Sequence, residues 1–398
     1  MPYCVSICPY CDFVVVAGAA TRGPRNSIAR FVAAVTAELE LRADALDERF
    51  GPSGSDDRPA LESLYFGGGT PSLLPADVIA VLIDLVRRRY GLVPGAEVTL
   101  EANPGPDERG DALALRPAGV TRLSIGAQSM LDAELRGLGR RHRASDVAAA
   151  LGAAREAGIG SVSLDLLYDV PGSSIDDFAA SLDAAMALQP DHVSLYALSL
   201  DDPSAEGLTG PLGDHLPTTS GARRWRERAR AEQDDDRAAA MYELAAGRLA
   251  TAGFRGYEIS NWARIGHESR HNLAYWQRRP HEAVGPGAHA FDGRERRWNA
   301  ARLGPYLAAL VPEDPEVPPG LPPGASEPVD EAAAAAEATI LELRLDTGID
   351  AAAGLRGPFA THLVWALDVG LLAPAGEGRL ALTTRGRLLS NELFARLV

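Results

Sequence analysis

The sequence predicts an α/β protein whose main part is an open, three-quarter barrel of six β/α units. Two observations predict this fold class. Five short apolar segments alternate with amphipathic helical segments, and strands that alternate with helices of ten or more residues form parallel sheets. Most of these segments also end in a polar or glycine-rich signature, as expected where a site is built at the ends of barrel strands. A sixth strand is expected just before the first cysteine.

The five predicted strands are short, and most are followed by a turn or cap signal. They lie at 61–66, 97–103, 121–128, 161–168 and 192–199, and their polar or glycine-rich ends are Gly67–Thr70, Glu101, Gln128 and Asp165. The predicted barrel helices lie at 27–47, 75–90, 145–157 and 174–188. In the first helix, apolar residues recur with the period of an amphipathic helix. Pro104 ends the second strand and Gly158 closes the third helix. The barrel is assigned to residues 1–200.

An α/β extension is predicted for residues 201–311. Its first part, 201–236, loses periodicity and holds an arginine-rich run, 223–230, beside three aspartates. We interpret this part as a solvated connector with locally balanced charges, in preference to a binding arm. A helix at 237–252 and a strand at 256–262 follow. Residues 312–330, rich in proline and glycine, are predicted to be a linker.

The last part of the chain, residues 331–398, is predicted to form a small winged-helix-like module. Helices at 331–344 and 358–369 precede a β-hairpin and a terminal helix. In DNA-binding proteins of this shape the recognition helix is basic, whereas 358–369 contains Asp368 and no arginine. We therefore expect this module to pack on the barrel or to dock a partner, and not to read DNA.

Composition excludes several classes of function. The chain has 398 residues, and its net charge of −15 argues against a general nucleic-acid binder. All 39 basic residues are arginine, which excludes lysine chemistry such as Schiff-base formation and the Walker-A phosphate loop. No signal peptide and no run of 18 apolar residues is present, so we expect a cytoplasmic protein without a membrane span.

All three cysteines lie within eight positions, in Cys4-Val-Ser-Ile-Cys8-Pro-Tyr-Cys11. Their clustering fits a reducing compartment, and thiolates suit iron–sulfur clusters or zinc. A closed zinc site needs a fourth ligand, and the nearest histidine in the sequence is His142. Three thiolates on a four-iron cluster leave one iron open to another ligand. A zinc site that borrows a distant histidine and a redox Cys-x-x-Cys pair are the alternatives.

Several motifs together resemble one protein family. They are the cysteine loop, Gly67-Gly-Gly-Thr-Pro71, Leu100-Glu-Ala-Asn-Pro104, Leu123-Ser-Ile-Gly-Ala-Gln-Ser129, Gly139-Arg-Arg-His142 and Asp165-Leu-Leu-Tyr168. They are similar to motifs of the radical S-adenosylmethionine (SAM) proteins related to oxygen-independent coproporphyrinogen III oxidase. The resemblance covers most of the chain, and it is greatest to the branch of heme chaperones called HemW.

The resemblance implies a role for individual residues of the barrel. Cys4, Cys8 and Cys11 would hold a [4Fe–4S] cluster. Gly68, Gly69 and Thr70 would meet the amino group of SAM, since glycine lets the backbone approach a ligand closely. The other positions that match SAM-binding residues of the family are Glu101, Gln128, Arg140, Asp165 and Ala197.

A second motif, His271-Asn272-Leu-Ala-Tyr275-Trp276, resembles one that marks HemW proteins and is associated with heme. A histidine can supply a nitrogen ligand to heme iron, and aromatic side chains can pack on the macrocycle. Without the resemblance, the alternative interpretation is a polar turn anchored by two aromatic residues.

Two functional hypotheses follow. The first is a heme chaperone that binds heme and a SAM-ligated cluster and passes heme to an unidentified acceptor protein; contact with a membrane-bound acceptor is compatible with it. The second is an enzyme that decarboxylates coproporphyrinogen III with a 5′-deoxyadenosyl radical. The oxidases carry a further cysteine where this chain has Phe13, so we expect no oxidase activity. A zinc-binding structural protein is a third possibility, but it lacks an evident fourth ligand.

The resemblance also predicts something about the start of the chain. Only three residues precede Cys4, whereas the family places its first strand and a SAM-contacting tyrosine just upstream. We therefore expect either that the natural chain starts earlier or that the first barrel unit is incomplete, with an exposed sheet edge beside the cluster.

Overall fold

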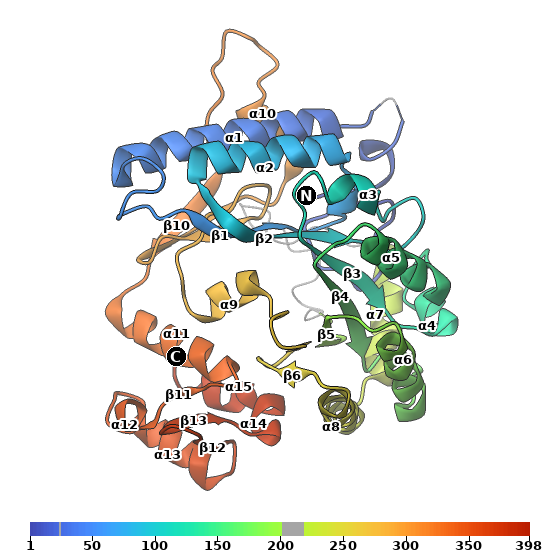
Figure 1. The fold of residues 1–398 in the computed structure, drawn as a ribbon, viewed down its shortest axis with the longest axis vertical. Coiled ribbons are helices and arrows are strands. Elements are labelled where there is room, and N and C mark those ends of the chain that lie inside the picture. The colour runs from blue at the N-terminus through green and yellow to red at the C-terminus, as the bar shows by residue number, and fades with distance from the viewer. Residues whose placement is uncertain (24, 201–218) are drawn as a thin grey trace.

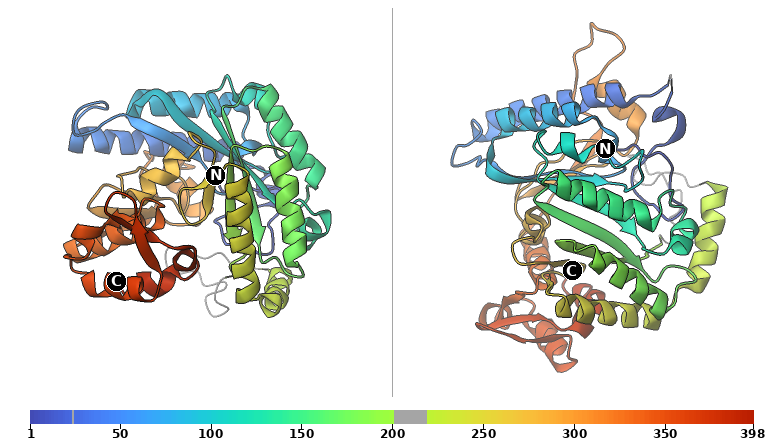
Figure 2. Two further views of the ribbon diagram at one scale, coloured as in Figure 1. Left: turned by 60° about the horizontal axis from the view of Figure 1, so that its bottom comes forward. Right: turned by 45° about the vertical axis from the view of Figure 1, so that its right-hand side comes forward.

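The computed structural model describes residues 1–23, 25–200 and 219–398 (Figure 1). Its centre is a seven-stranded sheet with the order β1-β2-β3-β4-β5-β7-β6. Strands β1 (Leu61–Phe66), β2 (Leu92–Ala102), β3 (Arg122–Gln128), β4 (Ser161–Tyr168) and β5 (His192–Ala197) are parallel. The sheet curls into an open half-barrel (Figure 2), which confirms the predicted fold class.

The end units of the barrel differ from the prediction. The strand predicted at 256–262 is two short strands, β6 (Arg255–Gly256) and β7 (Asn261–Ala263), which pair antiparallel with each other and continue the sheet from β5. A turn separates them, closed by the Glu258 carboxylate, which accepts the Ser260 backbone N–H. At the other edge, residues 1–3 run beside the turn after β1, with the Gly69 and Thr70 N–H groups donating to the Met1 and Tyr3 carbonyls.

Helices cover the outer face of the sheet (Figure 2). These are α1 (Ile28–Phe50), α2 (Ala76–Tyr90), α3 (Ala112–Leu115), α4 (Asp132–Gly137), α5 (Ala144–Glu156) and α6 (Ile175–Ala187). They begin and end close to the predicted boundaries where a helix was predicted. Their apolar faces pack against alternate strand residues such as Leu100, Ile125 and Leu164, all of which are buried. The main hydrophobic core therefore lies between the sheet and these helices.

The extension begins with α7 (Ser220–Glu232) and α8 (Asp235–Thr251). Part of the connector predicted at 201–236, residues 201–218, lies outside the described residues. The arginine-rich run lies within α7, and its Arg226 is only 1% exposed. The prediction that this run is solvated is therefore wrong for Arg226.

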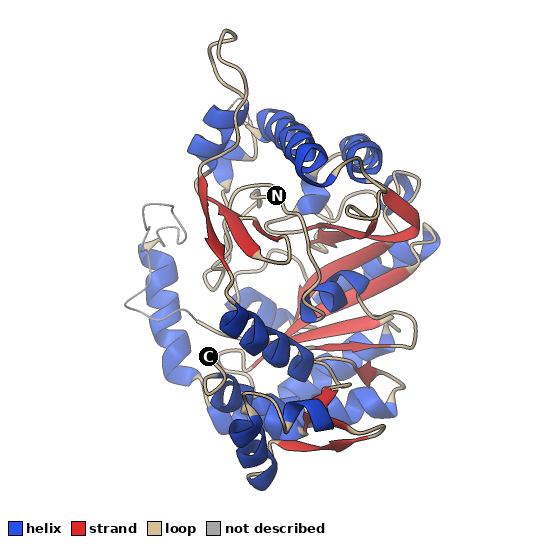
Figure 3. Cartoon of the chain, turned by 90° about the vertical axis from the view of Figure 1, so that its left-hand side faces the viewer, coloured by secondary structure: helices blue, strands red, loops and turns tan. Residues whose placement is uncertain are grey.

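A second sheet of three strands has the order β10-β9-β8 (Figure 3). Its strands are β8 (His289–Phe291), β9 (Glu295–Asn299) and β10 (Gly324–Pro328), and α9 (Arg270–Trp276) and α10 (Leu303–Leu310) complete the extension. Strand β10 pairs antiparallel with β9, so part of the segment predicted to be a linker is an edge strand of this sheet.

The C-terminal part contains α11 (Glu331–Arg344), β11 (Ile349–Asp350), α12 (Ala351–Gly354), α13 (Ala360–Asp368), β12 (Leu372–Ala375), β13 (Arg379–Leu382), α14 (Thr384–Leu388) and α15 (Ser390–Phe394). Its elements follow the order predicted for the winged-helix-like module, and its small sheet has the order β11-β13-β12. Leu343, Leu363 and Leu393 belong to a hydrophobic cluster of its own. Helix α11 packs against α9, which lies between this part and the barrel (Figure 1). Among the described helices, none is both long and apolar enough to cross a membrane.

Candidate cofactor sites on the inner face of the barrel

The inner face of the curled sheet is polar along all five parallel strands. Side chains alternate between the two faces of a strand, and the sequence alternates with them. The residues of one face are Ser63, Tyr65, Glu97, Thr99, Glu101, Arg122, Ser124, Ser161, Ser163, Asp165, His192, Ser194 and Tyr196. Parallel strands that are covered on both faces normally read as continuous apolar runs. The alternation of polar and apolar residues along these strands therefore also indicates a site on one face of the sheet. The sequence prediction used only the polar residues at the strand ends.

The cysteine loop lies at the carboxyl ends of the strands, against the turn after β1. The Thr70 hydroxyl donates to the sulfur of Cys4 at 3.4 Å, and the Arg140 guanidinium donates to the sulfur of Cys8 at 3.6 Å. A Cβ atom on Gly69 would lie 2.7 Å from the Tyr3 carbonyl oxygen and 3.1 Å from the Cys4 sulfur. Glycine at this position therefore permits the close approach of the loop.

The three thiols share a loop but are not arranged as a ligand set. All are free and partly exposed, and burial raises the pKa of Cys4 and raises that of Cys11 to about 12. Within the described ranges, no three His, Cys, Asp or Glu side chains are placed to hold a metal ion. Three soft donors on one loop, beside the positive charge of Arg140, fit an iron–sulfur cluster in chemical type. Binding would have to draw the sulfurs together and release their protons.

Helix α7 holds the cysteine loop in place. The Arg226 guanidinium donates to the carbonyl oxygens of Pro9 at 2.8 Å and Cys11 at 2.9 Å. The neighbouring Trp225 indole donates to the Gly137 carbonyl at 2.8 Å. The sequence analysis missed this role. A signal was present, because Ala222, Trp225, Arg226 and Ala229 recur at helical spacing within the charged run.

The predicted SAM residues lie around the same strand ends. One carboxylate oxygen of Glu101 accepts the Tyr65 hydroxyl at 2.8 Å and the other accepts the Gly68 N–H at 2.9 Å. Burial raises the pKa of Glu101 to about 7. Burial also raises the pKa of Asp165, whose carboxylate accepts the hydroxyls of Ser124 and Ser163.

The remaining predicted SAM residues come from β3, the turn between α4 and α5, and β5. Arg140 donates to the carbonyl of Gly126 at 3.0 Å and to the Asn103 side chain. Gln128 ends β3 in the left-handed region, at φ 65°, and its side-chain nitrogen would lie 3.0 Å from a Cβ atom on Gly126. Ala197 is exposed at the end of β5, in register with Tyr168 of β4. The structure thus places all of these residues at one end of the barrel.

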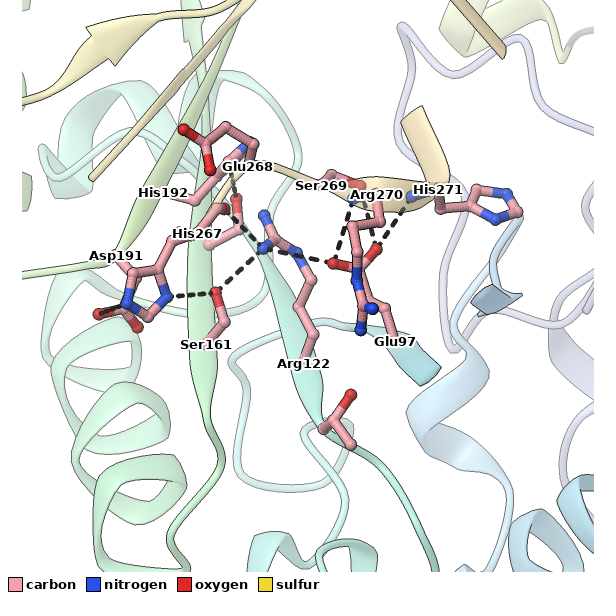
Figure 4. Close-up of polar contacts among 12 residues, drawn as sticks. Glu97, Arg122, Ser161, Asp191, His192, His267, Glu268, Ser269, Arg270 and His271 are labelled. Carbon is pink, nitrogen blue, oxygen red and sulfur yellow. Dashed lines mark hydrogen bonds and ion pairs between the residues drawn. The ribbon is translucent and has the colours of Figure 1, made fainter. Parts of the chain in front are cut away.

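The histidine motif forms the short helix α9, which the barrel anchors from the other end of its strands. The Glu97 carboxylate accepts the backbone N–H of Arg270 at 3.2 Å and of His271 at 3.1 Å (Figure 4). The buried Arg122 lies 3.9 Å from Glu97 and donates to the Ser161 hydroxyl and to the His267 carbonyl. The amino end of α9 is therefore held by polar side chains of β2 and, through Arg122, of β3.

The His271 ring is enclosed on several sides. Its Nδ1 lies 3.0 Å from the Ser63 hydroxyl and its Nε2 lies 3.1 Å from the Tyr275 hydroxyl. The ring stacks on Tyr65 with centroids 4.8 Å apart. Burial, and then the nearby His281, lower the pKa of His271 to about 4. The imidazole is therefore neutral at neutral pH, which is the form that binds a metal.

Trp276 lies between α9 and the C-terminal part. The Arg344 guanidinium of α11 lies 4.3 Å from the centre of its ring. The indole N–H of Trp276 is buried and has no hydrogen-bond partner within the described part of the chain. No residue of α9 is fully buried, so every residue of the motif, including Asn272, is partly exposed.

Comparisons with known proteins agree with these observations. The family model described as the radical SAM superfamily matches residues 1–185. The heme chaperone HemW of Mycobacterium tuberculosis (strain ATCC 25618 / H37Rv) is 38% identical over 100% of this chain and 93% of its own length. HemW of Bacillus subtilis (strain 168) is 29% identical over 99% of this chain and 96% of its own length.

A solved structure shows the same fold. Coproporphyrinogen III oxidase (HemN) from Escherichia coli matches with a TM-score of 0.78 at 21% identity, over 100% of this chain and 88% of the other. This match supports the fold, and the sequence relatives establish the branch, as the motifs predicted. The chain belongs to the HemW family of radical SAM proteins.

Proposed function

We propose that this protein is a heme chaperone that binds heme through α9, carries a SAM-ligated [4Fe–4S] cluster on the cysteine loop, and passes heme to an acceptor protein. The single observation that carries the proposal is the placement of His271. It is a neutral imidazole, anchored through its backbone to Glu97, on a helix with no fully buried residue. The relatives named heme chaperone support this reading.

The positions of the barrel residues support the roles that we propose for them. Cys4, Cys8 and Cys11 would hold the cluster, and Arg140 beside Cys8 would balance the negative charge of the thiolates. A cluster with three thiolate ligands supplies one-electron chemistry and an open iron site. The SAM-binding residues of the proposal are Gly68, Gly69, Thr70, Glu101, Gln128, Arg140, Asp165 and Ala197.

The His271 ring has a tautomer that suits an iron ligand. With the proton on Nδ1, the ring donates to the Ser63 hydroxyl and presents the lone pair of Nε2 toward Tyr275. Heme iron would then take the place of the Tyr275 hydroxyl at Nε2. Tyr275 and Trp276 supply aromatic surface for the macrocycle, and Asn272 lies on the same turn of α9.

The competing functions have less support. An oxidase would need the additional cysteine that Phe13 replaces, and the chain has no cysteine beyond Cys11. A zinc site would need a fourth ligand beside the three thiols, and the nearest histidine in the sequence is His142. We retain the division into 1–200, 201–311 and 331–398 as part of the proposal. The cytoplasmic setting and the absence of DNA binding stay predictions.

The experiment that tests this proposal combines binding, transfer and activity. Anaerobically reconstituted protein is titrated with heme and mixed with an apo-hemoprotein such as apomyoglobin. In a separate incubation it receives coproporphyrinogen III, SAM and a one-electron reductant such as dithionite, which radical formation from SAM requires. We expect one heme per chain, transfer of the Soret absorbance to the acceptor, and no porphyrinogen conversion. SAM-dependent formation of protoporphyrinogen would move the protein to the oxidase class, and the absence of heme binding would contradict the proposal.

A further inference from the structure

Tyr65 on β1 contacts a residue from each of the two proposed sites. Its hydroxyl donates to a carboxylate oxygen of Glu101 at 2.8 Å, at the SAM end of the barrel. Its ring stacks on His271, with centroids 4.8 Å apart and an angle of 24° between the planes. The Tyr65 side chain therefore lies between the proposed SAM ligand Glu101 and the proposed heme ligand His271 and contacts both.

The Tyr65 ring lies close against the backbone of Gly67. A Cβ atom on Gly67 would lie only 2.8 Å from Cε1 of Tyr65 and 3.3 Å from the bonded oxygen of Glu101. Glycine at position 67 therefore leaves room for the ring at the point where it meets the carboxylate. Burial, and then the Glu101 charge, hold the pKa of Tyr65 well above its usual value, so its hydroxyl stays a donor at neutral pH.

Strand β2 supports His271 in two ways. Glu97 and Glu101 lie four residues apart on the same face of β2. Glu97 accepts the backbone N–H of His271, and Glu101 holds the aromatic ring on which the imidazole stacks. A change at Glu101 is therefore transmitted to His271 through one hydrogen bond and one ring contact.

We propose that Tyr65 is a positioning residue shared by both sites, and that it makes the binding of SAM and the binding of heme cooperative. The inference rests on the proposed function, because it assumes both ligands. Donor groups of SAM at Glu101 favour the ionised carboxylate, and a hydrogen bond to an ionised acceptor is stronger than one to a neutral acceptor. A stronger bond fixes the Tyr65 ring and, with it, the orientation of His271. Because coupling between two binding sites is reciprocal, heme must tighten SAM by the same factor.

The test measures affinity and not turnover. Hemin is titrated into cluster-loaded protein with and without SAM, and its binding is monitored by the Soret absorbance. The affinity for SAM is measured by equilibrium dialysis with and without hemin. For the wild type we expect each ligand to tighten the other by about fivefold. Tyr65→Phe keeps the stacked ring and removes the hydroxyl. We expect the coupling factor to fall to about 1, whatever the change in the affinity for each ligand alone.

Two further variants make the outcome decisive. Tyr306→Phe removes a comparable tyrosine–carboxylate bond, to Glu38 at 2.7 Å, and should keep the wild-type coupling. Gly67→Ala pushes on the Tyr65 ring while keeping its hydroxyl, and should also reduce the coupling. Wild-type coupling in Tyr65→Phe, or independent binding of both ligands to the wild type, would overturn the inference. A wild type that binds no heme or no SAM would instead contradict the proposed function itself.

Discussion

The cysteine loop and helix α9 place their proposed ligands in opposite ways. The loop has little regular structure, with one isolated bridge between Tyr3 and Val16, and its thiols are not arranged as a ligand set. The imidazole of His271 has a partner at both ring nitrogens, and its backbone is held by Glu97. The protein thus positions the histidine by contacts to its ring and its backbone, whereas it holds the cysteines mainly through the backbone of their loop, which Arg226 binds.

The largest effect should come from the cysteines themselves. Cys8→Ser removes one of three thiolates, and the chain has no other cysteine to replace it. After anaerobic reconstitution we expect about four irons per chain in the wild type and almost none in the variant. Ser6→Ala, an exposed position in the same loop, is the matched control and should take up iron normally. Stoichiometric zinc in the wild type, with no iron uptake, would show that the assignment is wrong.

Next in size is the loss of the support that α7 gives to the cysteine loop. Arg226→Ala removes two charged hydrogen bonds to the carbonyls of Pro9 and Cys11, and should lower the free energy of unfolding by about 3 kcal/mol. We also expect a chelator to remove iron from the reconstituted variant faster than from the wild type. Arg228→Ala, an exposed arginine of the same helix, is the control. Equal unfolding midpoints and equal rates of iron removal in both variants would show that α7 does not stabilise the cysteine loop.

A pH-dependent effect of about 2 kcal/mol is expected from Glu101, whose carboxylate accepts the Tyr65 hydroxyl and the Gly68 N–H. Its pKa is about 7 in the folded chain against an ordinary value of 4.5. The folded state therefore keeps a proton that the unfolded state releases between these values. Unfolding free energy should fall by about 2 kcal/mol from pH 5 to pH 7 through this group.

Glu101→Gln should remove this part of the pH dependence. The measurement is the urea unfolding of wild type and variant at several pH values, with the difference between them plotted against pH. Parallel curves across pH 5 to 7 would mean that Glu101 has the same pKa in both states.

The smallest effect is expected from loosening α9. Glu97→Gln removes the charge that accepts the N–H groups of Arg270 and His271. We expect heme to bind about tenfold more weakly, a loss of about 1.4 kcal/mol, with unchanged iron content. The same substitution at Glu62, an exposed residue of β1 paired with Arg279, is the control. If both variants bind heme equally well, the contact between Glu97 and the backbone of α9 does not contribute to heme binding.

Local patterns predicted the barrel well because each unit is specified by its own residues. The strand at 161–168 and the helix over 175–187 have clear periodicity and clear ends. The role of Arg226 could not be predicted from its neighbours, because the carbonyls that it binds lie more than 200 residues earlier in the chain. Strand β10 could not be predicted for a similar reason, because the strand that it pairs with, β9, lies outside the proline-rich segment.

The site was predicted at the level of motifs but not of contacts. The strand-end signatures and the cysteine loop do lie at one end of the barrel. That His271 stacks on Tyr65 and is anchored by Glu97 depends on how the extension folds back into the barrel. No local sequence pattern specifies that return.

The most direct test of the two-region account counts heme iron and non-heme iron in the same samples. Wild-type protein and His271→Ala are reconstituted anaerobically with iron and sulfide, loaded with heme, and separated from free ligand. For the wild type we expect one heme and about four non-heme irons per chain. For the variant we expect weaker heme binding and a shifted Soret band, with the same non-heme iron content as the wild type. A variant with unchanged heme affinity and spectrum would show that α9 does not supply the ligand. Loss of both kinds of iron together would contradict the separation of the two ligand sets.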